Sequence, residues 1–380
     1  MKEILPITIF SIIFAVLSHK YSGYDPIECR YYRKERFFYI IMAIGLILFA
    51  GLRLGYNDTV TYREMYGIVT QNIDKYDSVF DGIEWLKIGD APGFEVTMRV
   101  MAKLGFSTQS FIMAFSAFYV SVNLWFFRKY SCNLWLSVLL YIVFAGYTFS
   151  LAAIKQCTAM ALCLIATDRA INKRYVQFVL FVAIACLFHA YSWMYLCVPF
   201  LFFRPWSKNT LIMLGIFGII GFAMESLLGT LLNVTDMLGE NYNAESFTGE
   251  GVNPIRLLVT AVPAVLALMT ATQIAEDEDK AQYAIVNLTM LNAEIMFVAL
   301  FGTANYFARL ANYFIPFQAV SIPWLLKHYD YEGRRTMTIL ATIGYVLFFI
   351  YSQSIHESFD VNYYSVTLWK YLQTLFQGVF

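Results

Sequence analysis

The chain has 380 residues, of which 59% are hydrophobic, 18% aromatic and only 14% charged. Soluble proteins average about 45–50% apolar and about 25% charged residues, so this composition excludes a soluble globular enzyme and a disordered chain. The 27 Lys and Arg residues are balanced by 27 Asp and Glu residues, which excludes a nucleic-acid-binding protein with a basic surface. The class that remains is a protein that crosses a membrane several times.

A transmembrane helix needs about 20 mostly apolar residues. The first apolar run, residues 4–17, is interpreted as a membrane helix because only Lys2 precedes it and no small-residue cleavage site follows. Further runs lie at 37–54, 109–127, 134–151, 152–168, 176–188, 190–203, 210–232, 255–274, 284–302, 309–326, 336–352 and, more weakly, 364–380. We therefore predict an all-α fold, a polytopic transmembrane helical bundle of about 12–13 spans, with residues 1–380 forming one membrane domain.

The orientation follows from the basic residues, which favour cytoplasmic loops. Most Lys and Arg residues lie in alternate loops, at 20–36, 128–129, 169–174, 204–208, 280 and 327–335. This side is predicted to be cytoplasmic, and His19 and His328 on it are left out of the candidate site. The acidic run at 276–279 is an exception on the same side. The segments predicted to be extracytoplasmic are a long loop at 55–108, a loop at 233–253 and the tail at 352–380.

Five ionisable residues fall at the predicted outer ends of spans, namely Arg53, Lys155, His189, Arg256 and Arg309. Ionisable groups at membrane depth are costly and by default mark a functional site, although each could instead snorkel to the outer headgroups. Arg provides paired hydrogen bonds to phosphate oxygens, and Lys provides a point charge. The cluster therefore predicts that the four Arg and Lys side chains bind the pyrophosphate of a lipid-linked substrate or the charge that develops on it.

The long outer loop begins with a motif that suits a sugar site, GLRLGYNDTVTYREMYG. Asp58 is predicted to be the N-cap of a helix over 59–69, on which Tyr62 and Tyr66 share one face. A carboxylate beside tyrosines can take a proton from a sugar hydroxyl, although a plain cap on a surface helix is the alternative. Asp58 or His189 is the predicted general base, with Asp58 favoured. The predicted sugar-binding residues are Tyr62, Tyr66, Gln156 and His356.

Residues 94–104, FEVTMRVMAKL, are predicted to form an amphipathic helix in the outer membrane interface. On this helix Glu95, Arg99 and Lys103 recur at a spacing of four residues. We interpret them as a solvated face of the helix and not as part of the site.

The order of several motifs resembles the EpsG-type, Wzy-like bacterial polysaccharide polymerases. The similar segments are RLGYNDTVTYREMY, AAIKQCTAMALCLIA, LFHAYSWMYL, ARLANYFIPFQAVSIPWLL and VNYYSVTLW, which together extend over residues 40–370. The chain departs from the family pattern at Lys155, where Arg is expected, and in the tail, which lacks a Pro before its Tyr. Lysine keeps the positive charge but loses the planar fork of arginine.

The resemblance implies a glycosyltransferase with a GT-C-like topology, multi-pass in the bacterial inner (cytoplasmic) membrane, with its active site on the extracytoplasmic face. It implies that undecaprenyl-pyrophosphate-linked oligosaccharides are joined into O-antigen, capsule or exopolysaccharide. The growing chain is transferred to the non-reducing end of an incoming unit. Membrane lipid and a chain-length regulator protein are the further partners considered, and no nucleic acid is expected. A pyrophosphate leaving group held by Arg and Lys needs no metal, so no metal and no cofactor are expected.

Three other functions are considered. A lipid-linked oligosaccharide flippase would also hold cations in the membrane, but its charged cavity should open to both sides. A membrane acyltransferase that modifies surface glycans would need an intramembrane His reached from the cytoplasm, whereas His189 maps to the outer end of its span. A structural membrane protein without chemistry would not bring the five ionisable side chains together.

Overall fold

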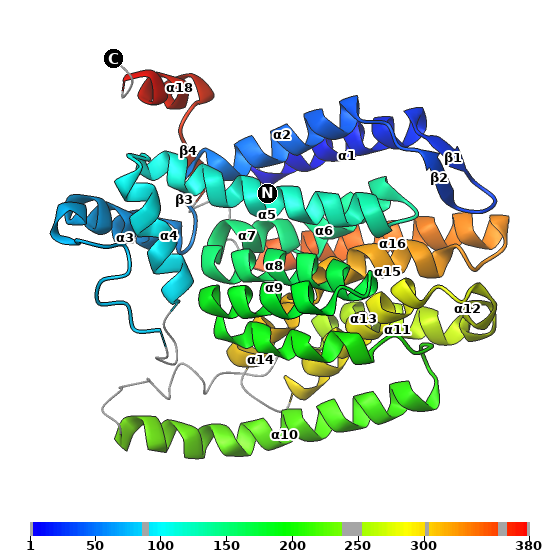
Figure 1. The fold of residues 1–380 in the computed structure, drawn as a ribbon. Helices are drawn as coiled ribbons and strands as arrows, with labels where there is room; N and C mark the ends of the chain where they lie inside the picture. The colour runs from blue at the N-terminus through cyan, green and yellow to red at the C-terminus, as the bar shows by residue number, and fades with distance from the viewer. Residues whose placement is uncertain (1–2, 86–90, 238–252, 301–303, 356–362, 378–380) are drawn as a thin grey trace. The chain divides into compact units, whose positions relative to one another are not determined.

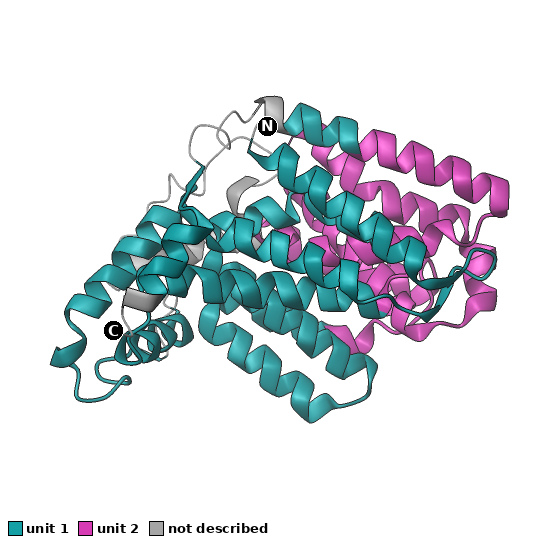
Figure 2. Cartoon of the chain, turned by 90° about the horizontal axis from the view of Figure 1, so that it is seen from above, with its two compact units in different colours: residues 1–129, 133–197, 346–380 teal, residues 130–132, 198–345 magenta. Residues whose placement is uncertain are grey.

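A computed structural model describes residues 3–85, 91–237, 253–300, 304–355 and 363–377. The described residues are mostly α-helical, with two short two-stranded sheets. The chain divides into two compact units, which Figure 2 shows in different colours. Unit 1 comprises residues 1–129, 133–197 and 346–380, and unit 2 comprises residues 130–132 and 198–345.

Unit 1 begins with two apolar helices, α1 (Ile4–Tyr21) and α2 (Phe37–Gly51), which pack side by side (Figure 1). An antiparallel hairpin of β1 (Gly23–Asp25) and β2 (Arg30–Arg33) joins them. Its turn forms because the Asp25 carboxylate accepts hydrogen bonds from the backbone N–H groups two and three residues later, at 2.8 and 3.2 Å. Asp is favoured in turns for this reason.

The rest of unit 1 is built from helices of different lengths. After the short strand β3 (Arg53–Gly55), these helices are, in chain order, α3 (Thr59–Gln71), the 3-10 helix η1 (Ile73–Lys75), α4 (Pro92–Lys103), α5 (Thr108–Tyr130), α6 (Leu134–Val143), α7 (Gly146–Ala152), α8 (Ile154–Ile171) and α9 (Tyr175–Phe188). An apolar core of α3, α4 and α5 side chains includes Phe94, Met98 and Phe111. The predicted helices at 59–69 and 94–104 correspond to α3 and α4.

The C-terminal segment returns to the start of unit 1. There β4 (Tyr364–Ser365) pairs antiparallel with β3, so that Arg53 lies opposite Ser365 and Gly55 lies opposite Tyr364. The backbone N–H of Val366 also donates to the carbonyl of Leu52 at 2.9 Å. The short helix α18 (Leu368–Gln377) follows. The described part of the weak span predicted at 364–380 is a strand and a helix of 10 residues, which is too short to cross a membrane.

Unit 2 is formed by helices from the second half of the chain. They are α10 (Lys208–Met237), α11 (Pro254–Met269), α12 (Ala271–Asp277), α13 (Lys280–Val298), α14 (Ala304–Asn312), α15 (Ile315–Leu326) and α16 (Tyr331–Ile355), whose last turns belong to unit 1. The buried helix α13 packs against α11 and α15. Its Asn287 side chain donates to the carbonyls of Leu201 and Phe203, both at 2.8 Å, and so connects α13 to the preceding loop.

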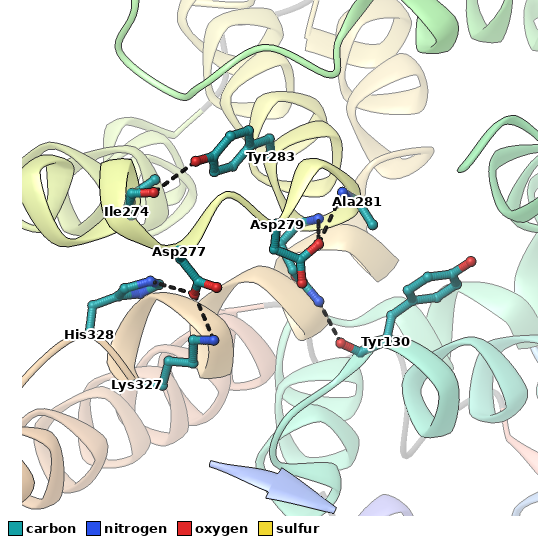
Figure 3. Close-up of polar contacts among 9 residues, drawn as sticks. Tyr130, Ile274, Asp277, Asp279, Ala281, Tyr283, Lys327 and His328 are labelled. Carbon is teal, nitrogen blue, oxygen red and sulfur yellow. Dashed lines mark hydrogen bonds and ion pairs between the residues drawn. The ribbon is translucent and has the colours of Figure 1, made fainter. Parts of the chain in front are cut away.

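The acidic run that seemed misplaced has structural roles in unit 2 (Figure 3). The Asp277 carboxylate accepts from Lys327 Nζ at 2.7 Å and from His328 Nε2 at 3.0 Å. Asp279 is the N-cap of α13 and accepts from the N–H groups of Ala281 and Gln282, both at 3.1 Å. These acidic side chains therefore connect α12, α13 and the end of α15, and His328 is part of that connection.

Three helices in the described part of the chain are long and apolar enough to cross a membrane, namely α1, α5 and residues Tyr331–Ser352 of α16. The bent pairs α6–α7 and α11–α12, with angles of 50° and 71°, bring the number to five if each pair is one span. Four shorter apolar helices are α2, α9, α15 and the Lys208–Ala223 part of α10. The predicted fold class, an all-α multi-pass membrane protein, is confirmed.

Two predicted spans have a different form in the structure. The run at 134–151 is the bent pair α6–α7, which breaks at Ala145 in the left-handed backbone conformation, with φ of 62°. The run at 190–203 contains the 3-10 helix η2 (Ala190–Phe200), which includes Pro199. Proline has no N–H to donate within a helix.

Unit 1 has two polar ends. At one end the Lys34 ammonium donates to the Arg128 carbonyl, and Lys129 pairs with Asp168. At the other end Gln109 donates to the carbonyls of Gly51 and Arg53, at 2.6 and 3.1 Å. Helix α5 runs between these ends, and its 23 residues span about 34 Å at about 1.5 Å per residue. That length matches a hydrocarbon layer of about 30 Å.

Candidate functional site

Arg53 is the structural centre of one end of unit 1. Its side chain is only 1% exposed. Its Nε donates to Thr59 Oγ1 and to the Leu151 carbonyl, both at 3.0 Å, and its Nη1 donates to Ser116 Oγ at 2.7 Å and to the Ala50 carbonyl. Burial lowers the pKa of Arg53 to about 10, so the guanidinium stays charged at neutral pH.

These contacts determine what Arg53 can do. The Ala50 and Leu151 carbonyls belong to the last turns of α2 and α7, where a positive charge complements the helix dipole. Thr59 begins α3, and Ser116 lies on α5. Arg53 therefore connects the ends of α2, α7 and α3 to the middle part of α5. We describe it as a positioning residue, because its buried guanidinium is already bonded to protein and is not an open phosphate contact.

Asp58 stands at the N-cap position of α3, as predicted, but its carboxylate makes no capping hydrogen bond. The reason is its backbone, with φ of −68° and ψ of −2°, whereas capping residues usually adopt an extended conformation. Its side chain is exposed. Among the described residues the Asp58 carboxylate has no partner, so this group is free to accept a proton or a hydrogen bond from a ligand.

The two tyrosines predicted to bind sugar differ in their surroundings. Tyr62 is partly buried and packs edge-on against Phe94, with ring centroids 5.6 Å apart. Tyr66 is fully buried, stacks on Phe111 at 4.4 Å and donates to the Phe106 carbonyl at 2.8 Å. Tyr66 thus belongs to the core and offers no ring face to a sugar, whereas Tyr62 lies at the edge of that core.

Lys155 lies in the first turn of α8, where its ammonium stands 5.3 Å from the centre of the Phe94 ring. The residue at the N-cap position is Ala153, which has no side chain able to cap the helix, and the first turn contains no acidic residue. The first N–H groups of a helix have no partner within it, and they favour anions. Gln156 follows in the same turn and is buried. Lysine and a helix N-terminus together make this point of unit 1 suitable for a phosphate.

His189 is also in unit 1, at the residue that ends α9. It is partly buried, and its ring lies edge-on to Tyr191 with centroids 5.0 Å apart. The preceding Phe188 packs against the same apolar core as Phe94 and Tyr62. The structure thus places Arg53, Asp58, Tyr62, Lys155 and His189 around one end of unit 1.

The two remaining arginines lie in unit 2. Arg256 is in the first turn of α11 and donates to Asn312 Oδ1 at 3.1 Å. Asn312 ends α14, and Arg309 lies one turn earlier on the same helix with an exposed side chain. The two arginines therefore share one end of unit 2. His356 and most of the predicted loop at 233–253 lie outside the described residues.

The interpretation of α4 as carrying a solvated charged face is wrong for Arg99, which is 3% exposed. Its guanidinium pairs with Glu95, donates to the Asp81 carbonyl and stacks over the Tyr76 ring at 4.0 Å. Lys103 donates to the carbonyls of Tyr76 and Asp77, at 3.0 and 3.2 Å. Residues 76–81 fold back over α4, and their carbonyl groups require donors that the helix supplies.

Sequence analysis missed Glu294, which lies near the end of the buried helix α13. A Cβ atom on Gly218 of α10 would lie 3.1 Å from its Oε1, which shows how closely α10 approaches this carboxyl group. Its Oε2 is buried without a hydrogen-bond partner among the described residues. A lone acidic residue within an apolar run is the signal that could have identified it.

These observations define an all-α multi-pass membrane protein with cationic, carboxylate and aromatic side chains gathered at helix ends. The profile of the EpsG family matches residues 36–371. The chain belongs to the EpsG family, and this family suggests a polysaccharide polymerase of the Wzy kind. Neither a curated protein nor a solved structure matches the chain.

Proposed function

We propose that the protein is a polysaccharide polymerase that joins oligosaccharide repeat units carried on undecaprenyl pyrophosphate. In this proposal it acts at the outer face of the bacterial inner membrane and transfers the growing chain to the non-reducing end of an incoming unit. The observation that supports the proposal is the position of Lys155, in the first turn of α8 and over the Phe94 ring that Tyr62 also contacts. A lysine at a helix N-terminus suits a pyrophosphate, and the aromatic rings beside it suit a sugar.

The reaction follows from the groups at this end of unit 1. The Asp58 carboxylate takes the proton of the acceptor hydroxyl, whose oxygen attacks C1 of the sugar on the donor lipid. The bond from C1 to the pyrophosphate oxygen breaks, and its electron pair leaves with the pyrophosphate. Lys155 and the N-terminal amides of α8 stabilise that charge. His189 is the alternative base, and Arg53 positions α3 and α7 around these groups.

The acceptor lipid carries a second pyrophosphate, one repeat unit away from the hydroxyl that reacts. A polymerase therefore needs two cationic contacts and not one. Arg256 and Arg309, which share one end of unit 2, are further cationic residues that we assign to pyrophosphate binding.

A complementation experiment tests the proposal. A strain deleted for the gene receives wild type, Lys155→Ala, Asp58→Asn or Arg309→Ala, with membrane levels measured in parallel. Lys75→Ala is the matched control, because Lys75 is an exposed lysine of the outer segment that holds Asp58, and its ammonium donates to the nearby Asn72 side chain. Surface glycan is then resolved by size on a gel.

The expected result is single repeat units in place of long ladders for the three site variants, and full ladders for wild type and Lys75→Ala. Loss of all surface sugar in the deletion strain would instead indicate a flippase. Full ladders that lack only an acyl group would indicate an acyltransferase. Either of these results would overturn the proposal.

A further inference from the structure

The strand pair β3–β4 carries an aromatic side chain that the reaction described above does not use. Tyr363 and Tyr364 are neighbours in the chain but contact different parts of unit 1. The Tyr363 ring stacks on the Phe49 ring with centroids 4.7 Å apart, and the Tyr363 hydroxyl donates to the Phe49 carbonyl at 2.9 Å. Together with Ser365 it lines a cavity of about 480 Å³, whose other walls are Glu3, apolar residues of α1 and α2, and Leu52. Tyr363 is therefore an anchor.

Tyr364 lies on the Gly55 backbone instead. A Cβ atom on Gly55 would stand 2.0 Å from Cε1 of the Tyr364 ring, so the ring rests where any other residue would place a side chain. Even so, Tyr364 is 53% exposed. Its hydroxyl group has no hydrogen-bond partner in the part of the chain that the structure describes. Unit 1 thus has an exposed aromatic ring at this position.

Arg63 is held close to β3, the strand that pairs with the strand of Tyr364. Its Nη1 donates to Gln109 Oε1 at 2.8 Å, and Gln109 in turn donates to the Gly51 and Arg53 carbonyls next to β3. Burial lowers the pKa of Arg63, and the Tyr364 phenol partly offsets that shift. The unpartnered Asp58 carboxylate lies three residues beyond Gly55 along the chain.

An exposed ring, a fixed guanidinium and a free carboxylate are the groups that recognise carbohydrate. The C–H face of a sugar ring packs on an aromatic face, and its hydroxyl groups bond to Arg and carboxylate side chains. We propose that Tyr364, with Arg63 beside it, is the stacking site for the sugar that carries the accepting hydroxyl. This inference rests on the proposed polymerase function and adds the residues that hold the acceptor against the base.

The test uses the full-length protein in nanodiscs and compares Tyr364→Ala, Tyr364→Phe and Gly55→Ala with wild type. Tyr364→Phe keeps the ring face, and Gly55→Ala pushes the ring out of place. Tyr32→Ala is the control, since Tyr32 is an 80% exposed tyrosine on the β1–β2 hairpin. Two quantities are measured: the half-saturating concentration of lipid-linked repeat units in polymerisation, and saturation-transfer NMR signals of the same oligosaccharide released from its lipid.

Tyr364→Ala and Gly55→Ala should raise the half-saturating concentration roughly tenfold, with the maximal rate changed far less, and should abolish the saturation-transfer signal. Tyr364→Phe should stay within about twofold of wild type, because the ring face is kept. Wild-type values for Tyr364→Ala would overturn the inference. So would lower membrane levels with unchanged activity per molecule, which would show that Tyr364 only anchors the chain at the membrane surface.

The two measurements separate this inference from the proposed function. If wild type binds the oligosaccharide through Tyr364 but does not extend it, the polymerase proposal fails and the sugar site stands. If wild type polymerises and none of the Tyr364 or Gly55 variants changes either quantity, the sugar site fails and the polymerase proposal stands.

Discussion

Replacing Arg53 with alanine tests whether this residue acts by positioning. The change removes the donors to Thr59, Ser116 and the carbonyls of Ala50 and Leu151. Hydrogen bonds from a charged group contribute about 1.5–3 kcal/mol each, but the Leu151 carbonyl keeps a second donor, the Thr59 hydroxyl at 2.8 Å. The net loss in the free energy of unfolding should therefore be about 3–5 kcal/mol, which also includes the cavity left behind.

The assay is thermal unfolding of the detergent-solubilised protein, followed by tryptophan fluorescence. Arg53→Ala should lower the Tm by roughly 10 °C, and Arg53→Lys should lower it by less, because an ammonium keeps the charge but cannot reach all four acceptors. Arg33→Ala is the control, since Arg33 is an exposed arginine on β2. An inactive Arg53→Ala protein with wild-type Tm and membrane level would refute the reasoning and make Arg53 a direct substrate contact.

Three further predictions concern other side chains. Asp58→Asn should lower the polymerisation rate about 10²–10⁴-fold without changing the Tm, because the carboxylate bonds to none of the residues that the structure describes; an active Asp58→Asn protein would transfer the role of base to His189. Burial lowers the pKa of His328, so the unfolded chain binds more protons and stability should fall as the pH drops below about 6.5. His328→Gln should make the Tm between pH 5.5 and 7.5 less dependent on pH than in wild type, and an unchanged dependence would remove His328 from this explanation. Arg99→Met should speed proteolysis within residues 76–81, which mass spectrometry of the fragments would detect, whereas an unchanged cleavage pattern would show that Arg99 does not hold this segment.

The elements that the sequence predicted well are those with a local pattern. The helical periodicity of apolar and polar residues predicts the ends of α3 and α4 to within two residues of those in the structure. Such periodicity depends only on neighbours in the chain. The membrane class follows from composition for the same reason. The bend at Ala145 was not predicted, since a left-handed alanine has no signal in composition or spacing.

The candidate site was predicted less completely, because its properties depend on tertiary contacts. The sequence shows that Arg53 is a charge at an unexpected position. It does not show that the guanidinium is buried among helix ends. Tyr62 and Tyr66 share a helix face as expected, yet only the packing on Phe111 shows that Tyr66 is core. The pairing of β3 with β4 joins segments about three hundred residues apart through a strand of two residues, too short to leave any pattern.

The β3–β4 pair also has a consequence for biosynthesis. Phe49 and Tyr363, which stack on each other beside this pair, are 314 residues apart in the chain. Chains emerge from the ribosome at about 5–20 residues per second, so roughly 15–60 seconds pass between the synthesis of Phe49 and that of Tyr363. During that time Tyr364 is absent from Gly55, and the end of unit 1 around Arg53 is incomplete. Translation itself therefore delays the assembly of this end until the last part of the chain has been inserted.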